Sequence, residues 1–259
     1  MKTTMARDIV GHPPACLSGW RPAHDWSFNQ SFAPVYQLVT PGDVSAHYSP
    51  GMRFRCVNGG MTKYFIVVAC AYVAPYGVTN LYLYGGTDYT LGVGITDEMY
   101  STDAYPLGFP ADPRKWSVTV TDTSNRSQSA PTANEWYNLG GVSIDIPYGL
   151  WQVRYEVNAR CSAGTDATIS SVYTCLSTTL GGTGAPPIPR LANVSFLNAA
   201  AFTGLYLLHL HAGQDVVKQA NLNPTTYYLL SRTAHDGMQS IQNRGDGRAT
   251  VIEARCAYL

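Results

Sequence analysis

The sequence predicts an all-β fold, and two observations carry that prediction. First, 18 tyrosines and a hydrophobic fraction of 45% are spread over short apolar runs, which 24 glycines and 16 prolines interrupt. Second, apolar and polar residues alternate in several runs, most clearly where Trp151, Val153 and Tyr155 alternate with Gln152 and Arg154. An alternation with a period of two is typical of a strand with one buried and one solvent-exposed face.

Residues 51–116 predict a small, barrel-like N-terminal domain. Two strand-like segments, Arg53–Cys56 and Thr62–Val68, flank the turn Asn58-Gly59-Gly60. Such a turn tolerates positive φ and joins antiparallel strands. Leucines and tyrosines then alternate over 81–84 until Gly85-Gly86 ends that strand. We therefore expect antiparallel strands that form a small barrel and present its loops.

The best linker candidate is the segment 121–134, which is rich in Ser and Thr and free of large apolar groups. We expect an N-terminal arm at residues 1–18, the barrel-like domain at 19–120, the linker at 121–134 and a second domain at 135–259. In the second domain, residues 234–248 predict a long polar loop, because Gly237, Gly245 and Gly247 interrupt it.

Part of the N-terminal domain resembles a known family. The sequence from Gly85 to Trp116 contains GGTDYTL, an IT–YST segment and PLGFP-DP-KW, and Gly19-Trp20-Arg21-Pro22 precedes it. This order resembles a β-rich domain of minor virion proteins of tailed bacteriophages, which occurs in their tail-tip, fibre and receptor-binding components. The resemblance implies a virion location, assembly in a host cytoplasm and contact with other virion proteins.

The second domain resembles a different group. The order Ile144-x-Ile-Pro-x-Gly, followed by Trp151 and its alternating strand, is similar to the early strands of jelly-roll domains of the tumour-necrosis-factor and complement type. The resemblance implies a jelly-roll β-sandwich in which the last strand, within 250–259, lies centrally. Relatives of this type are commonly threefold, so a homotrimer is also implied.

Composition and motifs argue against several function classes. Basic and acidic residues balance at 17 each, so no long-range field attracts nucleic acid. The longest apolar runs, 64–74 and 199–210, are shorter than the roughly 20 residues of a spanning helix, so we expect no membrane insertion. The six cysteines form no C-x-x-C pair and predict reduced thiols. We expect no cofactor.

The sequence also predicts a protein that is not an enzyme. It contains no Gly-x-Ser-x-Gly elbow, no His-Glu-x-x-His motif and no phosphate-binding loop. Asp97 with Glu98 is best interpreted as a pair of solvated loop charges, because neighbouring residues on a strand or turn point apart.

The candidate binding residues are aromatic rings with nearby polar groups. Tyr and Trp stack on the apolar face of a sugar while amides and charged groups bind its hydroxyls. The candidates in the second domain are Trp136, Tyr227, Tyr228, Asn243, Arg244, Asp246 and Arg248. The alternative for each ring is a place in the core or in a subunit interface.

His209 and His211 are a more speculative metal site. They share one face of an expected strand, and three copies at a trimer axis would supply six nitrogens to a transition-metal ion. The alternative is two ordinary strand histidines that face water or form hydrogen bonds between subunits.

By resemblance, the chain is a tail-tip, fibre or receptor-binding protein that attaches a phage particle to a host glycan or receptor. One alternative is a capsid decoration or head-fibre protein with the same folds. A glycan-degrading tailspike enzyme is a third, less favoured reading, because no well-spaced pair of carboxylates stands out.

Trimerisation is testable directly. Low charge combined with abundant apolar and tyrosine content favours an oligomer that hides apolar area. Light scattering on the purified chain should give a mass of about three times 28.1 kDa. A stable, monodisperse monomer at micromolar concentration would contradict the trimer.

Overall fold

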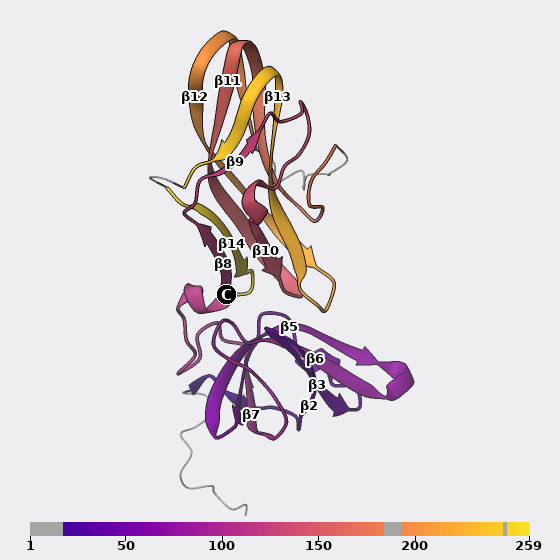
Figure 1. Cartoon of the computed structure of the whole chain (residues 1–259). Helices are drawn as coiled ribbons and strands as arrows, with labels where there is room; N and C mark the ends of the chain where they lie inside the picture. Colours follow the sequence, from indigo (N-terminus) through magenta and orange to yellow (C-terminus); the bar gives the residue numbers. More distant parts are fainter. Residues whose placement is uncertain (1–17, 184–192, 246–247) are drawn as a thin grey trace, which may run out of the picture. The chain divides into compact units, whose positions relative to one another are not determined.

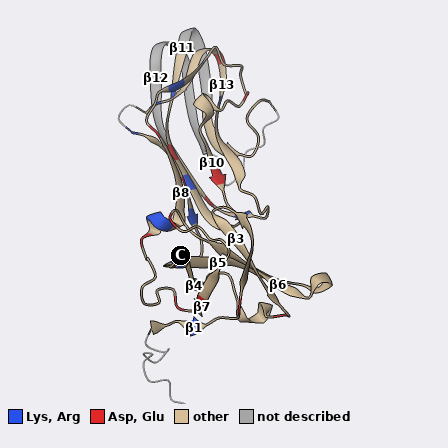
Figure 2. Ribbon diagram, turned by 60° about the horizontal axis from the view of Figure 1, so that its bottom comes forward, with Lys and Arg blue, Asp and Glu red and all other residues tan. Residues whose placement is uncertain are grey.

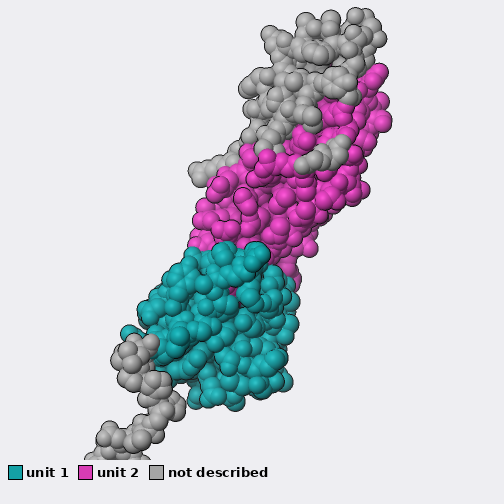
Figure 3. Space-filling view, turned by 90° about the vertical axis from the view of Figure 1, so that its left-hand side faces the viewer, with its two compact units in different colours: residues 1–115, 258–259 teal, residues 116–257 magenta. Residues whose placement is uncertain are grey.

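The computed structural model describes the backbone of residues 18–183, 193–245 and 248–259, and it describes no side chains within 163–170 and 193–211 (Figure 1). All but Ser18 of the expected N-terminal arm therefore lies outside the described residues. The chain divides into two compact units, coloured in Figure 3. Unit 1 ends at Lys115 and includes Tyr258–Leu259, and unit 2 comprises Trp116–Ala257.

The all-β prediction is confirmed. Every helix that lies wholly within the described residues is a 3-10 turn of three or four residues, and all strand pairs there are antiparallel. No helix among the described residues has the length and apolar character needed to cross a membrane.

Unit 1 is a single curled sheet with the strand order β1-β7-β4-β5-β6-β3-β2 (Figure 1). Its strands are β1 (Arg21–Pro22), β2 (Ser27–Phe32), β3 (Val35–Pro41), β4 (Arg53–Asn58), β5 (Met61–Val73), β6 (Val78–Tyr84) and β7 (Ile95–Ser101). β1 and β2 are the two edges in the described residues, so the sheet is a half-barrel. The hairpin expected at Gly59-Gly60 joins β4 to β5, and both glycines have positive φ, of 62° and 76°.

The core of unit 1 follows the period-two alternation of its strands. Phe54 and Cys56 on β4 share a buried cluster with Phe65 and Val67 on β5 and with leucines on β3 and β6. The first residue of β4 carries a buried charge, because Arg53 is only 1% exposed. Its guanidinium donates hydrogen bonds to the main-chain carbonyls of Gly51, Ala104 and Tyr258, at 2.6 to 2.9 Å, which satisfy much of its donor capacity.

Unit 2 is built from three long strands and four short ones. The strands are β8 (Ser117–Asp122), β9 (Arg126–Ser129), β10 (Ser143–Ile146), β11 (Gly149–Ser177), β12 (Asn193–Gln219), β13 (Thr225–Asn243) and β14 (Thr250–Cys256). β11 pairs with β12 along almost its whole length, with β14 through its first part and with β13 through its second part.

The long strands bend from one layer of a sandwich into the other. Tyr155 donates a hydrogen bond from its hydroxyl to the carbonyl of Thr174, at 2.9 Å, although both residues lie on β11. Their separation of 19 residues would span about 60 Å in a straight strand. β11 must therefore fold back on itself, and Figure 1 shows β11, β12 and β13 arching at one end.

Irregular pairing marks the bend. The register between β11 and β13 shifts between Ala163/Met238 and Thr168/Asp236, and Gly237 has a φ of 74°. The inner face of the folded sheet then carries the predicted alternation, since Trp151, Val153 and Tyr155 are each at most 1% exposed. A two-layered antiparallel sandwich, as the jelly-roll resemblance implies, is thus present in unit 2.

The last strand lies centrally, as the resemblance implies. β14 is hydrogen-bonded to β11 on one side and to β8 on the other.

Two expected segments need correction. The residues 121–134 do not link domains, because β8 ends at Asp122 and pairs with β14, while β9 pairs with β13, all within unit 2. Residues 234–248 are not one long loop, because β13 continues to Asn243. Both errors have one cause: short strands at a sheet edge, and strands that pass over an exposed bend, need few apolar side chains.

The bend in β13 gives a testable prediction. A valine at position 237 would have to adopt a left-handed conformation, which costs about 1–2 kcal/mol for a residue with a branched side chain. We expect Gly237→Val to lower the free energy of unfolding by about that amount in urea denaturation. The control is Gln239→Val, at an exposed position of the same strand, and it should change the free energy of unfolding by less than about 0.5 kcal/mol. Equal effects of both changes would contradict a conformational role for Gly237.

Candidate functional site

The aromatic candidates lie mostly inside unit 2. Trp136 is 4% exposed and packs against Cys175 and Leu230. The guanidinium carbon of Arg232 lies 4.7 Å from the centroid of the Trp136 ring and 4.4 Å from that of Tyr173. Cation–π contacts of this kind fix a ring to its neighbours, so Trp136 presents no open face for a sugar to stack on.

The two tyrosines point to opposite faces of β13. Tyr227 is 6% exposed and on the core side, and burial raises the pKa of its hydroxyl. Tyr228 is half-buried and packs against the cluster around Trp136. Successive residues of a strand cannot share one surface, so the structure does not unite Trp136, Tyr227 and Tyr228 in an aromatic platform.

The polar candidates are also separated. Asn243 is 2% exposed, and its side-chain oxygen accepts a hydrogen bond from the Ser231 hydroxyl at 3.1 Å. Arg248 is exposed and donates to Glu156 at 2.8 Å, whereas Arg244 is half-buried. Asp246 lies outside the described residues.

The metal candidates His209 and His211 lie on β12, where the backbone register pairs them with Ala159 and Val157. Their side chains lie outside the described residues, so a metal site there stays a prediction. Among the side chains that the structure does describe, no group of three His, Cys, Asp or Glu could hold a metal ion.

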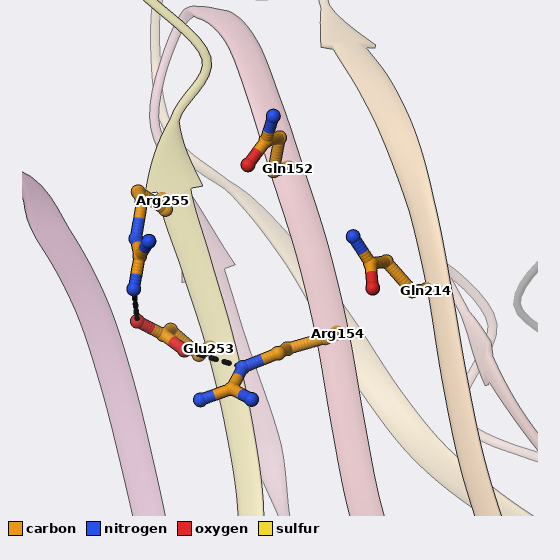
Figure 4. Close-up of a pocket in the computed structure, with 5 residues that line it drawn as sticks. All are labelled: Gln152, Arg154, Gln214, Glu253 and Arg255. Atoms are coloured by element: carbon orange, nitrogen blue, oxygen red, sulfur yellow. Dashed lines mark hydrogen bonds and ion pairs between the residues drawn. The ribbon is translucent and has the colours of Figure 1, made fainter. Parts of the chain in front are cut away.

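A polar recess on the outer face of unit 2 is the strongest candidate site (Figure 4). It has a volume of about 230 Å³, and its lining residues are Gln152, Arg154, Gln214, Glu253 and Arg255. Charged residues are otherwise sparse along the chain, as the mainly tan ribbon of Figure 2 shows. A concave site lined by convergent polar groups is a default candidate for ligand binding.

Strand register explains why these five side chains meet. Arg154 on β11 is directly opposite Gln214 on β12 and Glu253 on β14. Two residues earlier, Gln152 is opposite Arg255. All five positions lie on the outward face of the sheet, because the intervening residues Val153 and Ala254 are fully buried.

Ion pairs hold the floor of the recess in place. Glu253 accepts hydrogen bonds from Arg154 at 2.5 Å and from Arg255 at 3.3 Å, both drawn in Figure 4. Burial by itself would raise the pKa of the Glu253 carboxyl, but the hydrogen bonds and positive charges of the two arginines outweigh it and lower the pKa. Glu253 therefore stays ionised at neutral pH.

A second acidic residue extends the network along β11. Glu156 accepts a hydrogen bond from Arg248 at 2.8 Å and lies 3.9 Å from Arg154. Three guanidiniums thus face two carboxylates across β11, β14 and the segment that precedes β14, which leaves an excess of one positive charge. In addition, the Nε of Arg255 is buried without a hydrogen-bond partner among the described residues.

The buried cysteines contribute no reactive group to a site. Burial raises the pKa of the thiols of Cys56, Cys161 and Cys175 to about 12, so they stay protonated at neutral pH. None of the five cysteines that the structure describes forms a disulfide, and Cys16 lies outside the described residues.

Sequence reasoning missed the recess, although its signal was present. The residues Gln152, Arg154 and Glu156 form the wet face of an alternating strand, which is ordinarily only solvated. The strand that contains Glu253 and Arg255 has a similar pattern. Only the pairing of β11 with β14 brings the two sets together.

Comparisons with known proteins give little guidance. No family model and no curated protein matches the chain. Three solved structures from infectious bursal disease virus match weakly, and the chain spans about three fifths of their length.

The first is the Gx strain structure, with 15% identity, 88% of this chain and 61% of that chain covered, and a TM-score of 0.27. The second is a VP2 subviral particle, with 12% identity, 93% and 63% covered, and a TM-score of 0.25. The third is the T13 viral particle, with 15% identity, 90% and 60% covered, and a TM-score of 0.23.

The lowered pKa of Glu253 predicts a pH-dependent contribution to stability. A carboxyl with a folded-state pKa below its unfolded value of about 4.3 stabilises the fold above that value, and this contribution is lost as the pH falls through the folded-state pKa. We expect Glu253→Gln to lower the free energy of unfolding more at neutral pH than below about pH 3. Urea denaturation at both pH values tests this, and an equal loss at both would refute the ion-pair account.

Proposed function

We propose that this chain is a non-enzymatic structural component of a virus particle that attaches the particle to a host surface. The polar recess of unit 2 is the observation that carries the proposal. It is concave, outward-facing and lined by five hydrogen-bonding side chains on rigid strands, which suits recognition of a polar ligand.

In this proposal the two units have different roles, with unit 1 bound to the particle and unit 2 carrying the recess. The resemblance of residues 85–116 to tailed-phage minor virion proteins supports a role of unit 1 in attachment to the particle. Unit 2 is a stiff support for the recess, because the same bent strands form both of its layers. In a homotrimer, three copies of the recess would be presented together, and such multivalency strengthens weak individual contacts.

Labelling of purified virus particles, together with a cell-binding assay, tests the proposed function. Antibodies against the full chain should label purified virus particles at the tail tip or fibres in electron microscopy, and the labelled full chain should bind host cells. Label spread over the capsid without cell binding would favour the decoration or head-fibre alternative. Depolymerisation of host polysaccharide by the purified chain would favour the tailspike enzyme. Absence of label from the particles would refute a virion role altogether.

A further inference from the structure

The recess has the size of one small polar ligand. Its volume of about 230 Å³ falls below the roughly 300–1,000 Å³ of sites for drug-sized molecules. Figure 4 shows its side chains coming from β11, β12 and β14, with both glutamine amides on the same side of the sheet as the arginines. A single sugar residue is a suitable occupant on grounds of size.

The charge of the recess favours an anion. The network of Arg154, Arg248 and Arg255 with Glu156 and Glu253 has one positive charge in excess. Each guanidinium carries five N–H donors in a planar fork that matches a carboxylate, and the side chains of Arg154 and Arg255 are 53% and 42% exposed. One carboxylate on a ligand would neutralise the excess and accept such hydrogen bonds.

The other polar groups distinguish a sugar acid from a simple anion. Glu253 can only accept hydrogen bonds, and the side-chain amides of Gln152 and Gln214 each carry an acceptor oxygen beside their donors. Phosphate or sulfate would have almost nothing to donate to these acceptors. A sugar acid has hydroxyls that donate to them while its carboxylate binds the arginines.

A neutral sugar fits less well. The lining residues include no aromatic ring, so the recess offers no surface on which the apolar face of a pyranose could stack. Without stacking, binding depends on charge-assisted hydrogen bonds, which are roughly twice as strong as neutral ones. A ligand without a charge would therefore lose the main source of affinity.

We propose that the recess binds the carboxylate and adjacent hydroxyls of an acidic sugar residue, such as a uronic or sialic acid in a host surface glycan. The proposal rests on the proposed attachment function and names its ligand class. Arg255 and Arg154 bind the carboxylate, and Glu253 fixes both guanidiniums and accepts a ligand hydroxyl.

Saturation-transfer-difference NMR on the full chain tests the ligand class. The probes are glucuronate and N-acetylneuraminate, with glucose as a comparison, and inorganic phosphate is tested as a competitor that reduces the sugar-acid signal. We expect at least one sugar acid to bind, more weakly at high salt, and to bind more tightly than glucose and phosphate. Binding of neither sugar acid would overturn the proposal. Phosphate binding as tight as that of the sugar acid would also overturn it and leave a simple anion site.

Matched variants test the location. Arg255→Gln removes a guanidinium from the recess and should weaken sugar-acid binding about tenfold or more, since hydrogen bonds to a charged group are stronger than neutral ones. The control Arg114→Gln removes the same charge from unit 1, where the side chain of Arg114 is 91% exposed and pairs with Asp112, and should leave binding unchanged. Circular dichroism verifies that both variants fold.

Two results would contradict the location. Equal losses in Arg255→Gln and Arg114→Gln would show a general charge effect, and unchanged binding in a folded Arg255→Gln variant would place the ligand elsewhere. A failure of the recess proposal is distinguishable from a failure of the proposed attachment function. If Arg255→Gln still binds host cells like the unaltered chain, the recess proposal fails while attachment stands.

Discussion

Unit 2 depends on strands that leave one layer of the sandwich and continue in the other. The hydrogen bond from the Tyr155 hydroxyl to the Thr174 carbonyl joins the two halves of β11 across the core. Because β12 and β13 are paired with β11, they must follow its bend. The layers are therefore connected by main-chain hydrogen bonds around the fold as well as by side-chain packing between them.

The same bend determines where the polar recess can form. β13 pairs with β11 on both sides of the bend but only from Ala159 onward, so the first part of β11 is free to pair with β14. That pairing sets Arg154 beside Glu253, which lies 99 residues later in the chain. The recess is thus a consequence of long-range register. A shift of one residue in β14 would turn Glu253 and Arg255 into the core, where unpaired charges are costly.

The features that could be predicted from the sequence are those that a local pattern of residues determines. The Gly59-Gly60 turn and the alternation from Trp151 to Ala159 follow from φ preferences and period-two burial, and the structure has both. The predictions of a linker at 121–134 and of a loop at 234–248 were wrong, because the sequence of a polar strand resembles that of a loop until its pairing partner is known. The recess was missed for the same reason, since each of its strands alone has an ordinary solvent-exposed face.

The tyrosine content shows how composition misleads about binding. Abundant Tyr suggested a surface for sugars, yet buried tyrosines here find polar partners inside the protein. Tyr48 is 3% exposed and its hydroxyl oxygen accepts from the Trp26 indole, as the Tyr155 hydroxyl donates to Thr174. Recognition then depends on a few charges in a chain of zero net charge. Such charges act within about 8 Å at physiological salt, so specificity must come from the close geometry of the recess.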